Sequence, residues 1–157
     1  MISKLGALMT SIYALLNRLE FVPILFARLA LGVGFIQTGH GKLFGGHANV
    51  VELFTNLKIP MPELNAWFVS GLEFFGGILL VVGLGTRIIA LMLSFAMLVA
   101  GLTAVFPKDG FLGSLLSTEV LAMLMLLWLV FSGPGALSLD HLVAKKLAPP
   151  PPVKPPA

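Results

Sequence analysis

Long apolar runs dominate the pattern of hydrophobic and polar positions along this chain. An apolar helix needs about 20 residues to cross a hydrocarbon layer of roughly 30 Å, because each residue advances the helix by ~1.5 Å. Four runs come near this length, at residues 21–43, 65–84, 87–106 and 115–131. The pattern therefore predicts an all-α fold, a four-helix transmembrane bundle.

A different pattern precedes the first run, where apolar residues recur at steps of three and four. The apolar positions are Leu5, Leu8, Ile12, Leu15 and Leu19. This spacing predicts an N-terminal amphipathic helix over residues 1–20 that lies in the membrane interface. A signal peptide is the alternative, because Lys4 precedes an apolar stretch, but no small-residue cleavage site follows that stretch.

The connections between the runs indicate how the helices are joined. The turn at residues 83–87 is so short that the second and third spans are expected to form an antiparallel hairpin. The connection at residues 44–64 contains an apolar face suited to a short helix, which Pro60 and Pro62 would end. Residues 21–141 are thus assigned to a membrane domain and residues 142–157 to a proline-rich, disordered tail.

Composition agrees with lipid as the surrounding medium. Hydrophobic residues make up 57% of the 157 positions, charged residues make up 11%, and the mean hydropathy is +0.99. A water-soluble domain of this size could not bury so much apolar surface in one core. The chain has no cysteine, so it has no thiol nucleophile, no disulfide and no thiolate ligands. A redox role would therefore depend on a cofactor or a partner.

The charge pattern predicts membrane topology. The formal net charge of +3 is spread over single Lys and Arg residues at the ends of apolar runs, which favours a membrane interface over nucleic acid. Lys and Arg are enriched in cytoplasmic loops, so the side with more of them predicts cytoplasmic termini. If the spans alternate, one side carries Lys4, Arg18, Arg87, Lys145, Lys146 and Lys154, and the other carries Lys42, Lys58 and Lys108.

Charged residues inside the apolar runs are the first candidates for function. Hydrocarbon makes each of them cost ~2.5 kcal/mol or more unless it is paired or wetted. Counted from the cytoplasmic ends, Arg28 lies roughly 10 Å deep and Glu73 roughly 16 Å deep. We expect these two side chains to form a buried ion pair, with the alternative that Arg28 extends to the interface. Glycines at residues 32–34, 39–41 and 76–77 predict close helix contacts.

A second polar group is expected near the external ends of the helices. Lys42 and His40 end the first run, and Glu119 lies about one turn into the fourth. These three side chains are predicted to cluster at the external mouth of the bundle, with simple interface anchoring of Lys42 as the alternative. No metal site is expected, because the spacing of His40 and His47 matches no helical ligand pair.

Several short motifs, taken together in order and spacing, resemble the DoxX family of small four-helix membrane proteins. They are Arg28-Leu-Ala-Leu-Gly32, Gly39-x-x-Lys42, Glu73-x-x-Gly76-Gly77-x-Leu79-Leu80-x-x-Gly83-x-x-Thr86-Arg87 and Gly133-Pro134-Gly135-x-x-Ser138-x-Asp140. The resemblance covers residues 24–141 and implies a location in the bacterial cytoplasmic (inner) membrane. It also implies association with quinone-linked oxidoreductases, such as thiosulfate:quinone oxidoreductase, or with thiol and oxidative-stress assemblies. The positions that carry over are Arg28, Lys42, Glu73 and Arg87.

Two functional hypotheses follow. In the first, the protein is a membrane subunit of a redox complex and holds a quinone, an apolar molecule with carbonyl acceptors, while a partner supplies electrons. In the second, it is a non-enzymatic anchor or assembly factor for soluble partners. Both place it in a lipid bilayer with protein partners or as a homo-oligomer, and neither involves nucleic acid. The catalytic candidates are Glu73 and Arg28, and the expected quinone contacts are Arg28, Gln37, His40, Lys42, Glu73 and Glu119.

Overall fold

The computed structural model describes residues 19–147 together with residues 9, 13, 14, 16 and 17. Helices make up almost all of this part of the chain, and it contains no strand. The elements are α2 (Phe21–Phe44), α3 (His47–Asn56), α4 (Pro62–Val82), α5 (Thr86–Ala100), a π-helical segment (Gly101–Val105), α6 (Phe106–Leu115), α7 (Thr118–Ser132) and α8 (Leu139–Leu147). The prediction of an all-α fold is confirmed.

Within the described residues, three helices are long and apolar enough to cross a membrane. They are α2, α4 and the continuous helical stretch Thr86–Lys108, which includes α5 and the π-helical segment. The fourth predicted span forms α7, which has 15 residues and is equally apolar but shorter. At ~1.5 Å per residue, α7 is about 22 Å long, less than the hydrocarbon thickness of roughly 30 Å. The fourth apolar run therefore yields a shorter helix than the other three.

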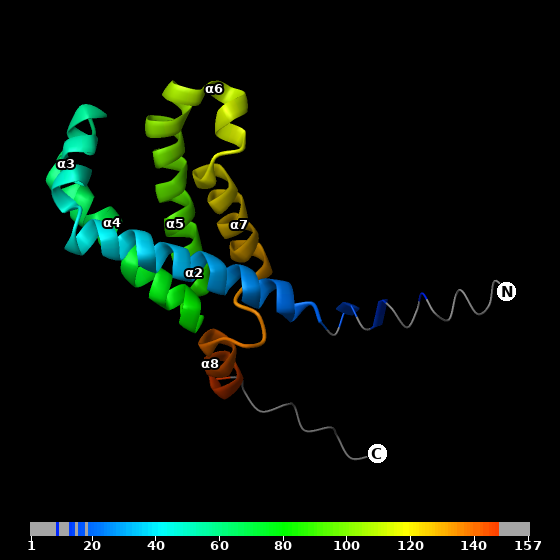
Figure 1. Ribbon diagram of the computed structural model, residues 1–157. Coiled ribbons are helices and arrows are strands. Elements are labelled where there is room, and N and C mark those ends of the chain that lie inside the picture. The colour runs from blue at the N-terminus through cyan, green and yellow to red at the C-terminus, as the bar shows by residue number, and fades with distance from the viewer. Residues whose placement is uncertain (1–8, 10–12, 15, 18, 148–157) are drawn as a thin grey trace, which may run out of the picture.

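The helices pack as two antiparallel pairs, α2 with α4 and α5 with α7. Figure 1 shows that the two pairs run in different directions and that α5 and α7 are joined through α6. The short turn between α4 and α5 forms the expected helical hairpin, in which Gly76 lies against Ile89 and Leu93. The fully buried apolar residues come from both pairs and are Ala66, Leu80, Ala90, Leu93, Leu126 and Leu129.

Glycines set the distance between α2 and α4. A Cβ atom added to Gly39 would lie 2.4 Å from the backbone nitrogen of Phe74, and one added to Gly77 would lie 2.7 Å from the carbonyl oxygen of Gly32. No side chain fits in that space, so the two backbones touch directly. The predicted close contact is confirmed at Gly32, Gly39 and Gly77, whereas Gly34 and Gly41 face open space.

Large apolar side chains cover the outside of the helices, as lipid contact requires. Phe26 on α2, Phe95 on α5 and Phe131 on α7 are each more than half exposed. In the connection between α2 and α4, α3 forms where a short helix was expected. Pro62 begins α4, a position where its missing N–H has no helical partner to lose.

The two ends of the chain are described only in part. The predicted amphipathic helix over residues 1–20 lies largely outside the described residues, and so do residues 148–157 of the proline-rich segment. Residues 142–147, assigned to the tail from the sequence, form the end of α8. Helix α8 lies at the end of the molecule where α4 turns into α5 (Figure 1).

Candidate functional site

The motif residues gather in two polar centres on α2. The turn cluster consists of Arg28, Gly83, Ser138 and Asp140, and it lies where α4, α5 and α8 meet. The second centre is the pair formed by Lys42 and Glu73 between α2 and α4. Fourteen residues separate Arg28 from Lys42, so the centres lie about 21 Å apart along the helix axis.

Arg28 binds backbone and not Glu73. Its guanidinium group donates from Nη1 to the carbonyl oxygen of Pro134 at 2.5 Å and from Nη2 to that of Leu137 at 2.5 Å. Only 2% of Arg28 is exposed, so these two bonds hold the C-terminal segment against α2 inside the protein. The predicted ion pair between Arg28 and Glu73 is wrong.

Asp140 joins the C-terminal segment to the turn between α4 and α5. Its carboxylate accepts hydrogen bonds from the backbone N–H groups of Gly85, at 2.7 Å, and Thr86, at 2.9 Å. The first N–H groups of a helix have no partner within the helix, so this carboxylate caps α5. The backbone N–H of Asp140 in turn donates to the carbonyl oxygen of Gly83 at 2.9 Å. Asp140 is also the acid whose charge acts on Arg28.

The turn itself requires glycine. Gly83 has φ of 77°, in the left-handed region, and a Cβ atom there would lie 2.6 Å from Nη1 of Arg28. Arg87, the other cation carried over from the family resemblance, is exposed and lies next to Gly133 at the same end. The motif residues of the turn cluster therefore close one end of the helices, and their hydrogen bonds are made largely with backbone groups.

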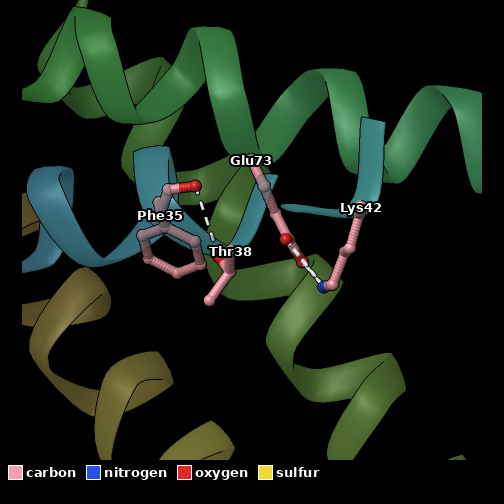
Figure 2. Close-up of polar contacts among 4 residues, drawn as sticks. All are labelled: Phe35, Thr38, Lys42 and Glu73. Atoms are coloured by element: carbon pink, nitrogen blue, oxygen red, sulfur yellow. Dashed lines mark hydrogen bonds and ion pairs between the residues drawn. The ribbon is translucent and has the colours of Figure 1, made fainter. Parts of the chain in front are cut away.

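The second centre is a compact ion pair of two side chains. Nζ of Lys42 lies 2.6 Å from Oε1 and 2.7 Å from Oε2 of Glu73, so one ammonium group binds both carboxylate oxygens. Figure 2 shows Glu73 reaching from α4 to meet Lys42 of α2. The Glu73 side chain is 2% exposed and the Lys42 side chain 36% exposed. The carboxylate is thus sealed within the protein, whereas the lysine remains accessible.

Two further polar side chains, Thr38 on α2 and Ser70 on α4, lie beside this pair. Thr38 is one turn before Lys42 and donates from its hydroxyl to the carbonyl oxygen of Phe35 at 3.2 Å (Figure 2). Ser70, one turn before Glu73 on the buried face of α4, has a fully buried hydroxyl without a hydrogen-bond partner among the described residues. Neither residue is among the contact residues predicted from the sequence. The only sequence feature that could have identified them is helical spacing: Thr38 lies four residues before Lys42, and Ser70 lies three residues before Glu73.

The other predicted contact residues lie elsewhere. His40 packs on the opposite flank, its ring 4.8 Å from that of Phe44 and 6.0 Å from that of Phe74. Gln37 is exposed and precedes Lys42 by five residues, which turns it about 140° away around the helix. The structure therefore brings together Lys42 and Glu73 from the predicted set, but not Gln37 or His40.

The predicted external cluster of Lys42, His40 and Glu119 is not formed, because Lys42 pairs with Glu73 instead. Glu119 lies in the first turn of α7, where its negative charge favours the helix N-terminus. Ser117 is the N-cap of this helix, and its hydroxyl accepts a hydrogen bond from the N–H of Val120 at 3.3 Å. Within the described residues, no group of three or more His, Cys, Asp or Glu side chains is arranged to hold a metal ion.

Comparison with known proteins agrees with the motifs. The chain is 32% identical over 132 residues to "Inner membrane protein YqjF" of Escherichia coli (strain K12), a match that covers 83% of this chain and 99% of that protein. It is 28% identical over 130 residues to "Putative oxidoreductase CatD" of Bacillus subtilis (strain 168), covering 83% of this chain and 93% of that protein. No solved structure matches the chain. The DoxX family model matches residues 24–105, which include both Arg28 and the Lys42–Glu73 pair, and this membrane protein belongs to the DoxX family.

Proposed function

We propose that this protein is the membrane component of a quinone-linked oxidoreductase system in the bacterial cytoplasmic membrane, with both termini in the cytoplasm. The observation that carries the proposal is the carboxylate of Glu73, sealed inside membrane-spanning helices and bound to a lysine that is still accessible. A buried ionisable pair in a membrane helix is costly and is usually retained for function. The two relatives, named "Putative oxidoreductase CatD" and "Inner membrane protein YqjF", support the same proposal.

The Lys42–Glu73 pair fits the polar end of a quinone. A quinone has an apolar body that dissolves in lipid and carbonyl oxygens that accept hydrogen bonds. The ammonium group of Lys42 can donate such a bond from the accessible side of the pair, while Glu73 holds it in place from the buried side. Arg28 is assigned no contact with the quinone, because its hydrogen bonds are directed at Pro134 and Leu137.

The chain contributes binding and proton transfer to this reaction. A quinone supplies the redox couple, since its reduction to a quinol consumes two electrons and two protons. The electrons come from a partner oxidoreductase, because the chain has no cysteine to supply them by thiol oxidation. Lys42 donates a proton toward the carbonyl oxygen, and Glu73 is the adjacent group that exchanges the replacement proton.

Quinone binding by the purified full-length chain in lipid nanodiscs tests the proposal. We expect Lys42→Gln and Glu73→Gln each to weaken binding of a short-chain quinone analogue by roughly tenfold or more, because each removes a charge-assisted hydrogen bond. Matched controls are Lys108→Gln and Glu52→Gln, which make the same changes at exposed positions away from the pair. In membranes, quinol formation driven by the partner should fall in the same two variants.

Two results would contradict the proposed quinone site. If the wild-type chain binds no quinone analogue but purifies in mild detergent with a stoichiometric soluble partner, the protein is an anchor or assembly factor. If Lys42→Gln and Glu73→Gln bind the analogue as tightly as the controls, the quinone site lies elsewhere. A thermal unfolding measurement on each variant separates loss of binding from loss of fold.

A further inference from the structure

Helix α8 is held at the edge of the membrane by its first turn. Asp140 accepts hydrogen bonds from Gly85 and Thr86, and its own N–H donates to Gly83, so three bonds join α8 to the turn between α4 and α5. Both α4 and α5 belong to stretches that are long and apolar enough to cross a membrane. The turn between two consecutive spans lies where the hydrocarbon layer ends. Helix α8 therefore starts at the membrane interface.

The apolar face of α8 is uncovered. At 100° per residue, its four large apolar side chains lie within an arc of about 140° around the helix. Each is at least 40% exposed among the described residues: Leu139 40%, Leu142 56%, Val143 47% and Leu147 78%. The opposite side carries His141, and the carboxylate of Asp140 is directed at the turn. This arrangement is that of an amphipathic helix whose apolar face is left uncovered by the described part of the chain.

The charge of α8 indicates what covers that face. Lys145 and Lys146 occupy its last turn, and its single acid, Asp140, is engaged in capping α5. Both lysines are exposed, and Lys146 lies within the apolar arc, where its stem can follow lipid while its ammonium group reaches the headgroups. A basic amphipathic helix at an interface is complementary to a surface of anionic lipids.

We propose that α8 lies in the interface of the same membrane, with its apolar arc at the acyl chains and Lys145 and Lys146 on anionic headgroups. The C-terminal segment is thereby held between two attachments, the turn cluster inside the protein and the lipid surface outside it. This proposal does not depend on the role of Lys42 and Glu73.

The absence of cysteine makes a direct test available. The full-length chain carrying Leu142→Cys, labelled with an environment-sensitive fluorophore, is placed in vesicles of phosphatidylcholine alone or mixed with phosphatidylglycerol. We expect blue-shifted emission and protection from aqueous iodide, both greater with the anionic lipid. The matched control is His141→Cys, which points about 170° from the centre of the apolar arc and should remain open to iodide in both vesicles.

The lysines supply a second measurement on the same labelled chain. The two vesicle types can be compared by the ratio of iodide protection with anionic lipid to protection with phosphatidylcholine alone. Each replacement of Lys145 or Lys146 by Gln should lower this ratio by about fivefold. Equal quenching of the labels at the Leu142 and His141 positions in both vesicles would overturn the proposal. Protection that appears only in native membranes, and not in defined vesicles, would also overturn it by assigning the face to a protein partner.

Discussion

The two polar centres on α2 differ in what their charges touch. Arg28 is almost fully buried and donates to two backbone carbonyl groups of the C-terminal segment. Lys42 is partly exposed and, among the described residues, binds one side chain, Glu73. A buried charge bonded to two backbone positions of a distant segment is held in place by both. A charge bonded to one side chain at an accessible edge can exchange partners with a ligand. The first centre therefore belongs to the fold, and the second is available for chemistry.

The largest expected effect is a loss of stability when Arg28 of the turn cluster is replaced. Arg28→Met should lower the free energy of unfolding by about 2–4 kcal/mol, because the buried carbonyl groups of Pro134 and Leu137 lose their donors and Asp140 loses its nearby cation. Arg28→Lys should recover only part of this loss, since one ammonium group cannot reproduce a planar fork that reaches two carbonyls. Unfolding in bicelles measures both. If Arg28→Lys is as stable as wild type, the fork geometry has no role.

A smaller effect is expected where α2 meets α4. Gly39→Ala should destabilise the protein by about 1–3 kcal/mol, because its new Cβ would overlap the backbone of Phe74 and push apart the helices that hold Lys42 and Glu73. Gly41→Ala is the matched control two residues away, where a Cβ meets nothing within 4 Å. That substitution should leave stability unchanged or raise it by up to ~1 kcal/mol, since Ala favours helix more than Gly. Thermal unfolding of the two variants in detergent distinguishes them, and equal destabilisation would contradict the close-contact interpretation.

The smallest expected effect is that of replacing Ser70, which tests whether this residue belongs to the second centre. Ser70 shares the buried face of α4 with Glu73, but its hydroxyl has no partner among the described residues. Ser70→Ala removes an unpaired buried polar group, so stability should stay the same or rise by up to ~1 kcal/mol. Quinone binding should not change. A loss of binding in a variant that folds normally would add Ser70 to the site and enlarge the second centre.

The difference between the two centres also explains why the predicted pairing was wrong. Ile36 lies beside Gly77 and Gly39 beside Phe74, so each step along α2 corresponds to one step back along α4. Extending that register from Ile36 back to Arg28 reaches the turn at residues 83–85, well past Glu73. The depths expected for Arg28 and Glu73 place the apparent ends of α2 and α4 at the membrane surface, but α2 begins about three turns beyond the level at which α4 ends. The length of an apolar run in the sequence does not reveal this axial shift between α2 and α4.

Other parts of the molecule were predictable because their causes are local. Apolar length and composition are properties of a continuous segment, and they predicted the all-α fold, α2, α4, the α5 stretch and the short helix α3. The run that became α7 has the right composition, but the helix is interrupted at Leu116 and Ser117, which leaves α7 only 15 residues. The glycines at positions 32, 39 and 77 also predicted a close contact between helices, since only the smallest residues let two backbones touch.

The partners of the charged side chains could not be predicted from the sequence in the same way. Which cation meets Glu73, which carbonyl groups satisfy Arg28 and which acid caps α5 all depend on the relative shift of helices that are far apart in the chain. A shift of one helical turn moves an axial position by about 5.4 Å, which exceeds the length of a hydrogen bond, while leaving the hydropathy of every segment unchanged. Segment identity was therefore encoded in consecutive residues, whereas the partners of Arg28, Lys42, Glu73 and Asp140 were decided only when the helices packed.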